Sequence, residues 1–247
     1  MLAGFRTVAG VLRSLRTYYG DRQHRAGLER LYRPFVKAGD LVFDIGAHVG
    51  DRTGAFRHLG ARVVVIEPQP ALLMVLKLLY GRDRAVVIEP VAVGRAEGIA
   101  ELIVNRANPT VSTVSADFVV AADGAQNWQG QNWDARARVP MTTLDALIAR
   151  HGVPSFIKID VEGFEAEVLA GLTQAVPALS FEFTTIQPDV ALAALDRCVA
   201  LGFSRFNATL GETHAFVHDG WCSAAELGVW LRGLPHAANS GDVYAVL

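Results

Sequence analysis

A short run of residues between Leu41 and Asp51 has the types and spacing to hold a small polar ligand. The segment LVFDIGAHVGD is an apolar stretch that ends at Asp44, continues through Gly46 and Gly50, and leads directly into a helical pattern. Glycines in such a turn let backbone amides face a ligand at a helix N-terminus. The turn lacks the first glycine of the dinucleotide pattern G-x-G-x-x-G, because Asp44 stands in its place. A carboxylate there repels a pyrophosphate and attracts an ammonium group.

A second acidic residue follows about 20 residues after the glycine turn. The run VVVIEP places Glu67 at the end of the next apolar stretch, where an acidic side chain can accept both hydroxyls of an adenosine ribose. S-adenosylmethionine carries an adenosine ribose, an α-amino group and a sulfonium, and it has no phosphate. Asp44 and Glu67 together therefore predict S-adenosylmethionine as the cofactor, rather than a nicotinamide dinucleotide.

The segment FIKIDVEGFEAEVLAGL, Phe156 to Leu172, gathers further charged residues at the end of an apolar run. Side chains alternate along a strand, so Lys158 and Asp160 share one face about 6.6 Å apart. A lysine inside a covered strand needs a carboxylate partner, and the candidates are Asp160 and Glu182 of LSFEF. Ligands of open α/β sheets bind at the carboxyl ends of the strands. We therefore predict catalytic roles in proton removal for Asp160 and, as second choice, Glu162.

Each of these charged residues also has an alternative interpretation. Lys158 and Glu182 could form a salt-bridge cluster that only fixes the sheet, and Glu162 could cap the following helix. Asp160, Glu162 and Glu182 could together bind a divalent cation through oxygen ligands. They lack the spacing of a defined ligand motif, so the sequence predicts no metal site. His48, inside the glycine turn, could act as a base, although a backbone role is favoured.

The elements that must position these residues alternate between short apolar runs and helical patterns beyond Pro34, which predicts an α/β fold around a mostly parallel sheet. Strands are expected at residues 41–45, 62–66, 85–88, 156–160, 179–183, 204–206 and 243–247. Helices are expected at residues 52–59, 70–79, 144–151, 164–172 and 190–201. Residues 105–138 are rich in Asn, Gln, Gly, Ser and Thr, which indicates a long loop or an excursion from the main domain.

Composition excludes several classes of partner. A chain of 247 residues that is 51% hydrophobic suits one compact α/β domain. Its net charge of -2 lacks the basic surplus of nucleic-acid-binding proteins, so no nucleic acid is expected. Neither Cys198 nor Cys222 lies in a zinc or redox pattern. No signal peptide or membrane-spanning run is recognisable. These features predict a cytoplasmic protein.

The first 37 residues differ in charge from the remainder. They hold eight Lys/Arg and two acidic residues, a charge of +6, whereas the rest of the chain carries -8. Apolar residues at helical spacing predict an amphipathic helix; they are Leu2, Phe5, Val8, Ala9, Leu12 and Leu15. We expect an N-terminal basic extension, residues 1–37, before a catalytic domain, residues 38–247. The helix could pack on the domain, cover the acceptor site or make peripheral contact with an anionic membrane surface. A homo-oligomer is left open.

Six motifs link the chain to a known family. FDIGAHVGDRT, VIEPQP, VAVG, TTLDAL, FIKIDVEGFEAEVLAGL and LSFEF lie between residues 41 and 183 in the order found in FkbM methyltransferases, which the chain therefore resembles. The resemblance implies the class I methyltransferase fold, a Rossmann-like seven-stranded, mostly parallel sheet with helices on both faces. It also implies methyl transfer from S-adenosylmethionine to an oxygen of a sugar or natural-product acceptor. The expected cofactor-binding residues are Asp44, Gly46, Ala47, His48, Gly50, Glu67, Pro68 and Ala92.

Two other functions are carried as alternatives. A nicotinamide-dependent oxidoreductase is disfavoured by Asp44 in the glycine turn and by the lack of a recognisable Tyr/Lys or Ser/Tyr catalytic pair after the fourth strand. A methyltransferase-like module that binds the cofactor without turnover would keep the same motifs.

Overall fold

A seven-stranded sheet forms the centre of the protein, for which a computed structural model describes residues 2–247 without the side chains of residues 2–5 and Arg22. Met1 and the side chains of Leu2 and Phe5, which belong to the predicted N-terminal helix, lie outside the described part. The strands are β1 (Leu41–Ile45), β2 (Arg62–Ile66), β3 (Val86–Glu89), β7 (Phe156–Ile159), β8 (Ala178–Thr184), β9 (Arg205–Leu210) and β10 (Ser240–Val246).

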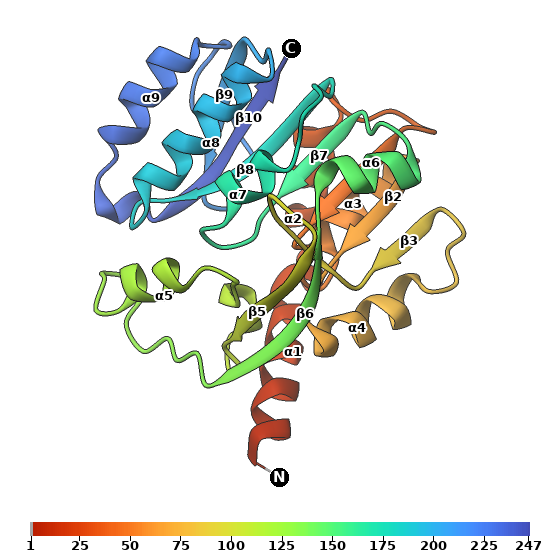
Figure 1. The fold of residues 1–247 in the computed structure, drawn as a ribbon. Coiled ribbons are helices and arrows are strands. Elements are labelled where there is room, and N and C mark those ends of the chain that lie inside the picture. The colour runs from red at the N-terminus through yellow and green to blue at the C-terminus, as the bar shows by residue number, and fades with distance from the viewer. Residues whose placement is uncertain (1) are drawn as a thin grey trace.

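The strand order in this sheet is β3-β2-β1-β7-β8-β10-β9 (Figure 1). Neighbouring strands from β3 to β8 are parallel, and β10 is antiparallel to both β8 and β9. The chain order reverses between β1 and β7, and ligand sites of doubly wound sheets lie outside the strand ends at such a point. The predicted mostly parallel seven-stranded sheet is confirmed.

Helices cover both faces of the sheet, because its central strands are apolar on both sides. On one face, Val42 packs with residues of three helices, α2 (Arg22–Tyr32), α3 (Asp51–His58) and α4 (Pro70–Tyr80). On the other face, Phe43 packs with four helices, α6 (Leu144–His151), α7 (Glu165–Ala170), α8 (Pro188–Ala200) and α9 (Ala224–Arg232). This three-layer arrangement holds the strand ends, and the polar residues that follow them, in fixed positions.

A smaller sheet projects from the main one and was not predicted. It has the order β4-β6-β5, formed by β4 (Ala92–Val93), β5 (Gly98–Val104) and β6 (Ala135–Thr142). Between β5 and β6 lie the short 3-10 helix η1 (Pro109–Val111) and the helix α5 (Ala116–Ala122). Of the two alternatives for residues 105–138, a loop is therefore wrong for residues 109–111, 116–122 and 135–138, which form regular elements of an excursion from the main sheet.

Local chemistry explains why these elements escaped prediction. Ser115 caps α5 by accepting the amide of Phe118, and the Phe118 ring packs between the rings of Trp128 and Trp133. These aromatic contacts are distant in sequence and leave no periodic pattern. In β6 (ARARVPMT) the exposed positions are two arginines and a proline. The strand therefore lacks the apolar run from which the strands of the main sheet were predicted.

The N-terminal residues form two helices of different character. The first, α1 (Leu2–Tyr19), leaves Val8 and Leu12 exposed and lies next to the smaller sheet (Figure 1). A Cβ at Gly10 would lie 2.8 Å from the carbonyl oxygen of Arg106. The second helix, α2, buries Leu28 and Tyr32 in the apolar cluster under the main sheet. A functional boundary at residue 37 stays a prediction. Within residues 2–247, no helix is long and apolar enough to span a membrane.

Candidate functional site

A cleft opens at the carboxyl ends of β1, β2, β7 and β8 and contains about 1170 Å³ of space, part of it open to solvent. Both predicted catalytic residues, Asp160 and Glu162, line it. So do seven of the eight predicted cofactor-binding residues, namely Asp44, Gly46, Ala47, His48, Glu67, Pro68 and Ala92. Sheet topology brings these residues together, since the ends of parallel strands meet at one edge.

The remaining predicted residue, Gly50, lies outside the lining of the cleft. It has a left-handed backbone with φ 82° and precedes the first residue of α3. A Cβ there would lie 2.8 Å from Leu76 and 2.7 Å from Tyr80 of α4. Gly50 therefore allows α3 and α4 to approach each other.

The glycine turn is tight because it passes against a neighbouring strand end. A Cβ on Gly46 would lie 1.7 Å from the carbonyl oxygen of Asp160, and the residue has φ 76°. The amides of Gly46 and Ala47 both donate to the carbonyl of Ile66, at 2.9 and 3.1 Å. The next amide, of His48, donates to a carboxylate, as described below. The expectation that these turn amides face a ligand is therefore wrong, because strand β2 and its terminal carboxylate take them instead.

Two buried carboxylates flank the turn. Asp44 is 2% exposed and accepts the Thr53 hydroxyl at 2.5 Å. Burial raises its pKa to about 6, although the Thr53 hydrogen bond opposes the shift. Glu67, also 2% exposed, accepts the amides of His48 at 2.9 Å and Gln69 at 2.8 Å. Burial raises the pKa of Glu67 to about 7 against these donors.

His48 takes part in the site mainly through its backbone. Besides the amide bond to Glu67, its ring packs edge-on against Tyr18 with centroids 5.7 Å apart. Burial lowers the pKa of its imidazole to about 4, so the ring is neutral at physiological pH. This geometry agrees with the favoured backbone role.

Lys158 is almost completely buried and joins two carboxylates. Its Nζ donates to Asp160 at 2.9 Å and to Asp242 of β10 at 3.0 Å. The predicted partner Asp160 is confirmed, whereas the second partner is Asp242 and not Glu182. Antiparallel pairing places Asp242 opposite Glu182, so the strand β10 brings a carboxylate that the local motif does not contain. Burial works to raise the pKa of Asp160, but Lys158 and then Arg52 outweigh it and hold that pKa below its ordinary value.

Glu162 occupies an unusual backbone position just beyond β7. It has φ 57°, and its carbonyl accepts the Thr113 hydroxyl at 2.7 Å. Burial, followed by the charges of Asp160 and Glu165, raises the pKa of its carboxyl well above the ordinary value. The alternative of a helix-capping Glu162 is wrong. Glu165 instead accepts the amides of Val161 and Gly163 ahead of α7.

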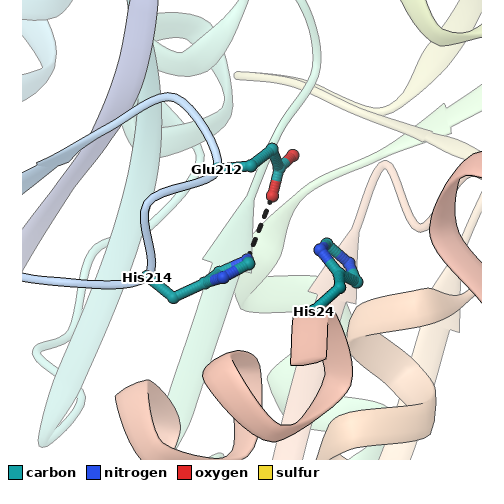
Figure 2. A group of neighbouring side chains, drawn as sticks. All are labelled: His24, Glu212 and His214. Carbon is teal, nitrogen blue, oxygen red and sulfur yellow. Dashed lines mark hydrogen bonds and ion pairs between the residues drawn. The ribbon is translucent and has the colours of Figure 1, made fainter. Parts of the chain in front are cut away.

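The mouth of the cleft is a network of charged groups from both ends of the chain. Arg52 donates to Asp51 at 2.6 Å and to Glu212, after β9, at 2.8 Å. Asp51 also bonds His24 of α2 at 3.1 Å, and Glu212 bonds His214 at 3.2 Å. Figure 2 shows Glu212 and His214 on one loop facing His24 on a helix, with the imidazole centroids 4.8 Å apart. His214 therefore packs at the rim, and it is Glu212 that lines the cleft.

Several lining residues were missed by the sequence reasoning. They are Tyr18 of α1, Arg52, Glu212 and Asp242. Asp242 had a signal, since it is an acidic residue directly before the expected strand at residues 243–247. Tyr18 and Glu212 had none, because only the tertiary fold brings α1 and the loop after β9 to the same cleft.

Residues 44–219 match the family described as Methyltransferase FkbM domain. The chain belongs to the FkbM methyltransferase family. The matched segment starts at Asp44 and includes Glu67, Asp160 and Glu162. Two parts of the cleft wall lie outside it, Tyr18 on α1 and the strand β10 with Asp242. The FkbM domain therefore supplies the predicted cofactor and catalytic residues, while flanking segments complete the cavity.

Three solved structures of low sequence identity are similar to this FkbM protein. An O-methyltransferase from Bacillus cereus, in complex with SAH, is 11% identical, with 98% of this chain and 90% of that chain covered and a TM-score of 0.46. A TehB-like SAM-dependent methyltransferase from Corynebacterium glutamicum is 13% identical, with coverage of 89% and 86% and a TM-score of 0.45. Precorrin-6y C5,15-methyltransferase from Geobacter metallireducens is 11% identical, with coverage of 90% and 86% and a TM-score of 0.44. A comparison with curated protein sequences found no match.

Proposed function

We propose that the protein transfers a methyl group from S-adenosylmethionine to a hydroxyl of a sugar or natural-product acceptor. The observation that carries the proposal is the charge of the cleft. Its lining holds eight acidic residues, Asp44, Asp51, Glu67, Asp160, Glu162, Glu182, Glu212 and Asp242. The two basic residues, Arg52 and Lys158, are each paired with two carboxylates. Such a cavity favours a ligand with an ammonium and a sulfonium over one with a pyrophosphate.

The residues around the glycine turn fit this cofactor chemically. Asp44 has a second carboxylate oxygen beyond the one that Thr53 holds, and it can accept the α-amino group. Glu67 is fixed by two backbone amides at the end of β2, the position suited to the ribose hydroxyls. Pro68 and Ala92 add apolar wall beside it, as an adenine ring requires. No basic side chain of the lining lies unpaired to receive a phosphate.

Bound S-adenosylmethionine would supply an already activated methyl group, so the chain has to align the acceptor and remove its proton. Asp160 is the proposed proton acceptor, because Lys158 keeps it ionised at the strand end facing the cleft. Glu162 is the second candidate, and its raised pKa makes it the stronger base once it is ionised. At the mouth, Tyr18, Arg52 and Glu212 offer polar groups for a hydroxyl-bearing acceptor.

Calorimetry with S-adenosylmethionine and NAD, each titrated into the full chain at pH 8, tests the cofactor. We expect binding of S-adenosylmethionine alone, and preferential binding of NAD would overturn the proposal in favour of an oxidoreductase. Transfer of a radiolabelled methyl group to cell extracts, and then to fractionated sugars and natural products, tests the reaction. Cofactor binding without transfer to any extract would instead support a binding module without turnover.

A further inference from the structure

Three carboxylates converge in the cleft where β7 and β8 end. Asp160 and Glu162 follow β7, and Glu182 lies near the end of β8. One carboxylate oxygen from each residue lies within 4.8 Å of the other two. Two oxygens on opposite sides of a Ca²⁺ ion, each about 2.3 to 2.6 Å from it, are about 4.6 to 5.2 Å apart, and around Mg²⁺ they are about 4 Å apart. The three oxygens are therefore close enough for small side-chain movements to bring them into one coordination sphere.

Two of these carboxylates have buried oxygens without a partner. Glu162 is 6% exposed, and its Oε2 has no hydrogen-bond partner among the described residues. The same holds for Oε2 of Glu182. Other buried carboxylates of the cleft differ, since Asp44 has the Thr53 hydroxyl and Glu67 has two backbone amides. A buried, unpartnered carboxylate oxygen costs free energy unless a cation or donor satisfies it.

The cations already present do not satisfy these oxygens. Lys158 is the basic side chain nearest the strand ends, and it is held by Asp160 and Asp242 at 2.9 and 3.0 Å. Arg52, the other basic residue of the lining, is held by Asp51 and Glu212 at the mouth. The described basic side chains of the lining are therefore paired elsewhere, and burial together with the neighbouring carboxylates raises the pKa of Glu162 and of Glu182 well above the ordinary value.

We propose that Asp160, Glu162 and Glu182 bind one divalent cation of the Mg²⁺, Mn²⁺ or Ca²⁺ class. All three ligands are carboxylate oxygens, which these hard cations prefer over softer metals. The site lies in the same cleft as the proposed cofactor residues. Its catalytic role, which rests on the proposed function, is to hold the acceptor hydroxyl beside the methyl group and to make its proton easier to remove. The structure thus revises the expectation of no metal site, because folding creates a spacing that the sequence does not display.

Titration of Mn²⁺ into the full chain, followed by the loss of the free-ion EPR signal, tests this site without cofactor or acceptor. We expect one bound ion per chain. Glu162→Gln and Glu182→Gln should each weaken Mn²⁺ binding by about tenfold or more, because each removes one charged ligand while keeping the side-chain volume. Near-UV circular dichroism of both variants confirms that they fold, and Mn²⁺ should raise the melting temperature of the wild type more than theirs.

Glu212→Gln is the matched control, because Glu212 lines the same cleft but belongs to the separate cluster with His24 and His214 (Figure 2). This variant should bind Mn²⁺ like the wild type. If Glu212→Gln loses the ion while Glu182→Gln keeps it, the ion sits at the histidine cluster and the proposal is wrong. Absence of Mn²⁺ binding at millimolar concentration also overturns it.

The two proposals can fail separately. S-adenosylmethionine binding and methyl transfer without any Mn²⁺ binding would remove the cation site and leave the proposed function intact. A bound Mn²⁺ that depends on Glu162 and Glu182, in a protein that neither binds S-adenosylmethionine nor transfers methyl groups, would confirm the cation site and refute the proposed function.

Discussion

Replacement of Asp44 by asparagine tests two effects of its buried charge separately. One is the cost of the charge to folding stability, and the other is its contribution to cofactor binding. Asp44 is 2% exposed and has one hydrogen-bond donor, the Thr53 hydroxyl. Asn has the same shape, and its carbonyl oxygen can keep that hydrogen bond. The variant therefore removes the negative charge and little else, and it directs an amide group where the cofactor ammonium is expected.

The structure gives the expected size of both effects. Burial raises the pKa of Asp44 from 3.8 to about 6, and this difference corresponds to about 3 kcal/mol of destabilisation when the group is ionised. Because the folded-state pKa is raised, this cost is present at pH 8 and disappears as pH falls below about 4. Asp44→Asn should thus raise the free energy of unfolding at pH 8 by up to about 3 kcal/mol. Loss of a charged hydrogen bond should weaken cofactor binding by about 1.5 to 3 kcal/mol, or roughly tenfold to a hundredfold.

Urea unfolding at pH 8 and at pH 4 measures the first effect, and calorimetry with S-adenosylmethionine at pH 8 measures the second. Thr53→Val is the matched control, since it keeps the charge of Asp44 and removes its donor. That variant should lose about 1.5 to 3 kcal/mol of stability, because a buried carboxylate loses its donor, and keep cofactor affinity within a few fold. An Asp44→Asn protein that binds S-adenosylmethionine like the wild type would refute the role of the charge. A variant less stable than the wild type at pH 8 would refute the proposed cost of burial.

Three further outcomes are expected. Asp160→Asn should keep cofactor affinity within a few fold and lower the rate of methyl transfer by about 10² or more, and undiminished turnover in a radiolabel assay would place the proton acceptor elsewhere. The affinity of the wild type for S-adenosylmethionine should increase from pH 5.5 to 8 as Asp44, with a pKa of about 6, and Glu67, with a pKa of about 7, become ionised; a flat calorimetric profile would contradict this. A chain starting at Asp21 should melt cooperatively yet lose most activity on its acceptor, because it lacks Tyr18 in the cleft wall, and full activity would make α1 dispensable.

The main sheet could be predicted because its strands are buried on both faces. Runs such as LVFDI and RVVVI are apolar apart from Asp44 and Arg62 and are bounded by polar or glycine-containing turns, so β1 and β2 were predicted with their exact bounds. The bounds of the helix α6 were also predicted exactly, and in the structure Thr143 caps it by accepting the amide of Ala146. The smaller sheet and α5 could not be predicted in the same way. Their stability comes from contacts such as Phe118 with Trp128, which join residues without local periodicity.

The residues of the candidate site also divide into those whose positions could be predicted from the sequence and those whose positions could not. Asp44 lies near the end of β1, and Glu67 and Asp160 directly follow β2 and β7. The position of a parallel strand end is fixed by the strand itself, so their convergence could be predicted. Asp242 could not be assigned to Lys158, because their contact depends on β10 lying antiparallel beside β8. The turn amides were also misjudged, since the carbonyl of Ile66 takes two of them and Glu67 takes the third.

The mouth of the cleft differs from its interior in what holds it together. The interior residues stand at the ends of strands packed between helices, whereas the mouth joins α2 to the loop after β9 through Arg52, Glu212 and His24. The pair of Arg52 with Glu212 is partly exposed, since the Glu212 side chain is 47% exposed, and such pairs contribute little to stability. Asp51 is buried against Arg52 and His24, so loss of either partner would leave a buried charge without compensation. Glu212 can therefore be replaced with little cost to the sheet. Acceptor choice is expected to depend on such residues, while methyl transfer is expected to depend on the strand ends beneath them.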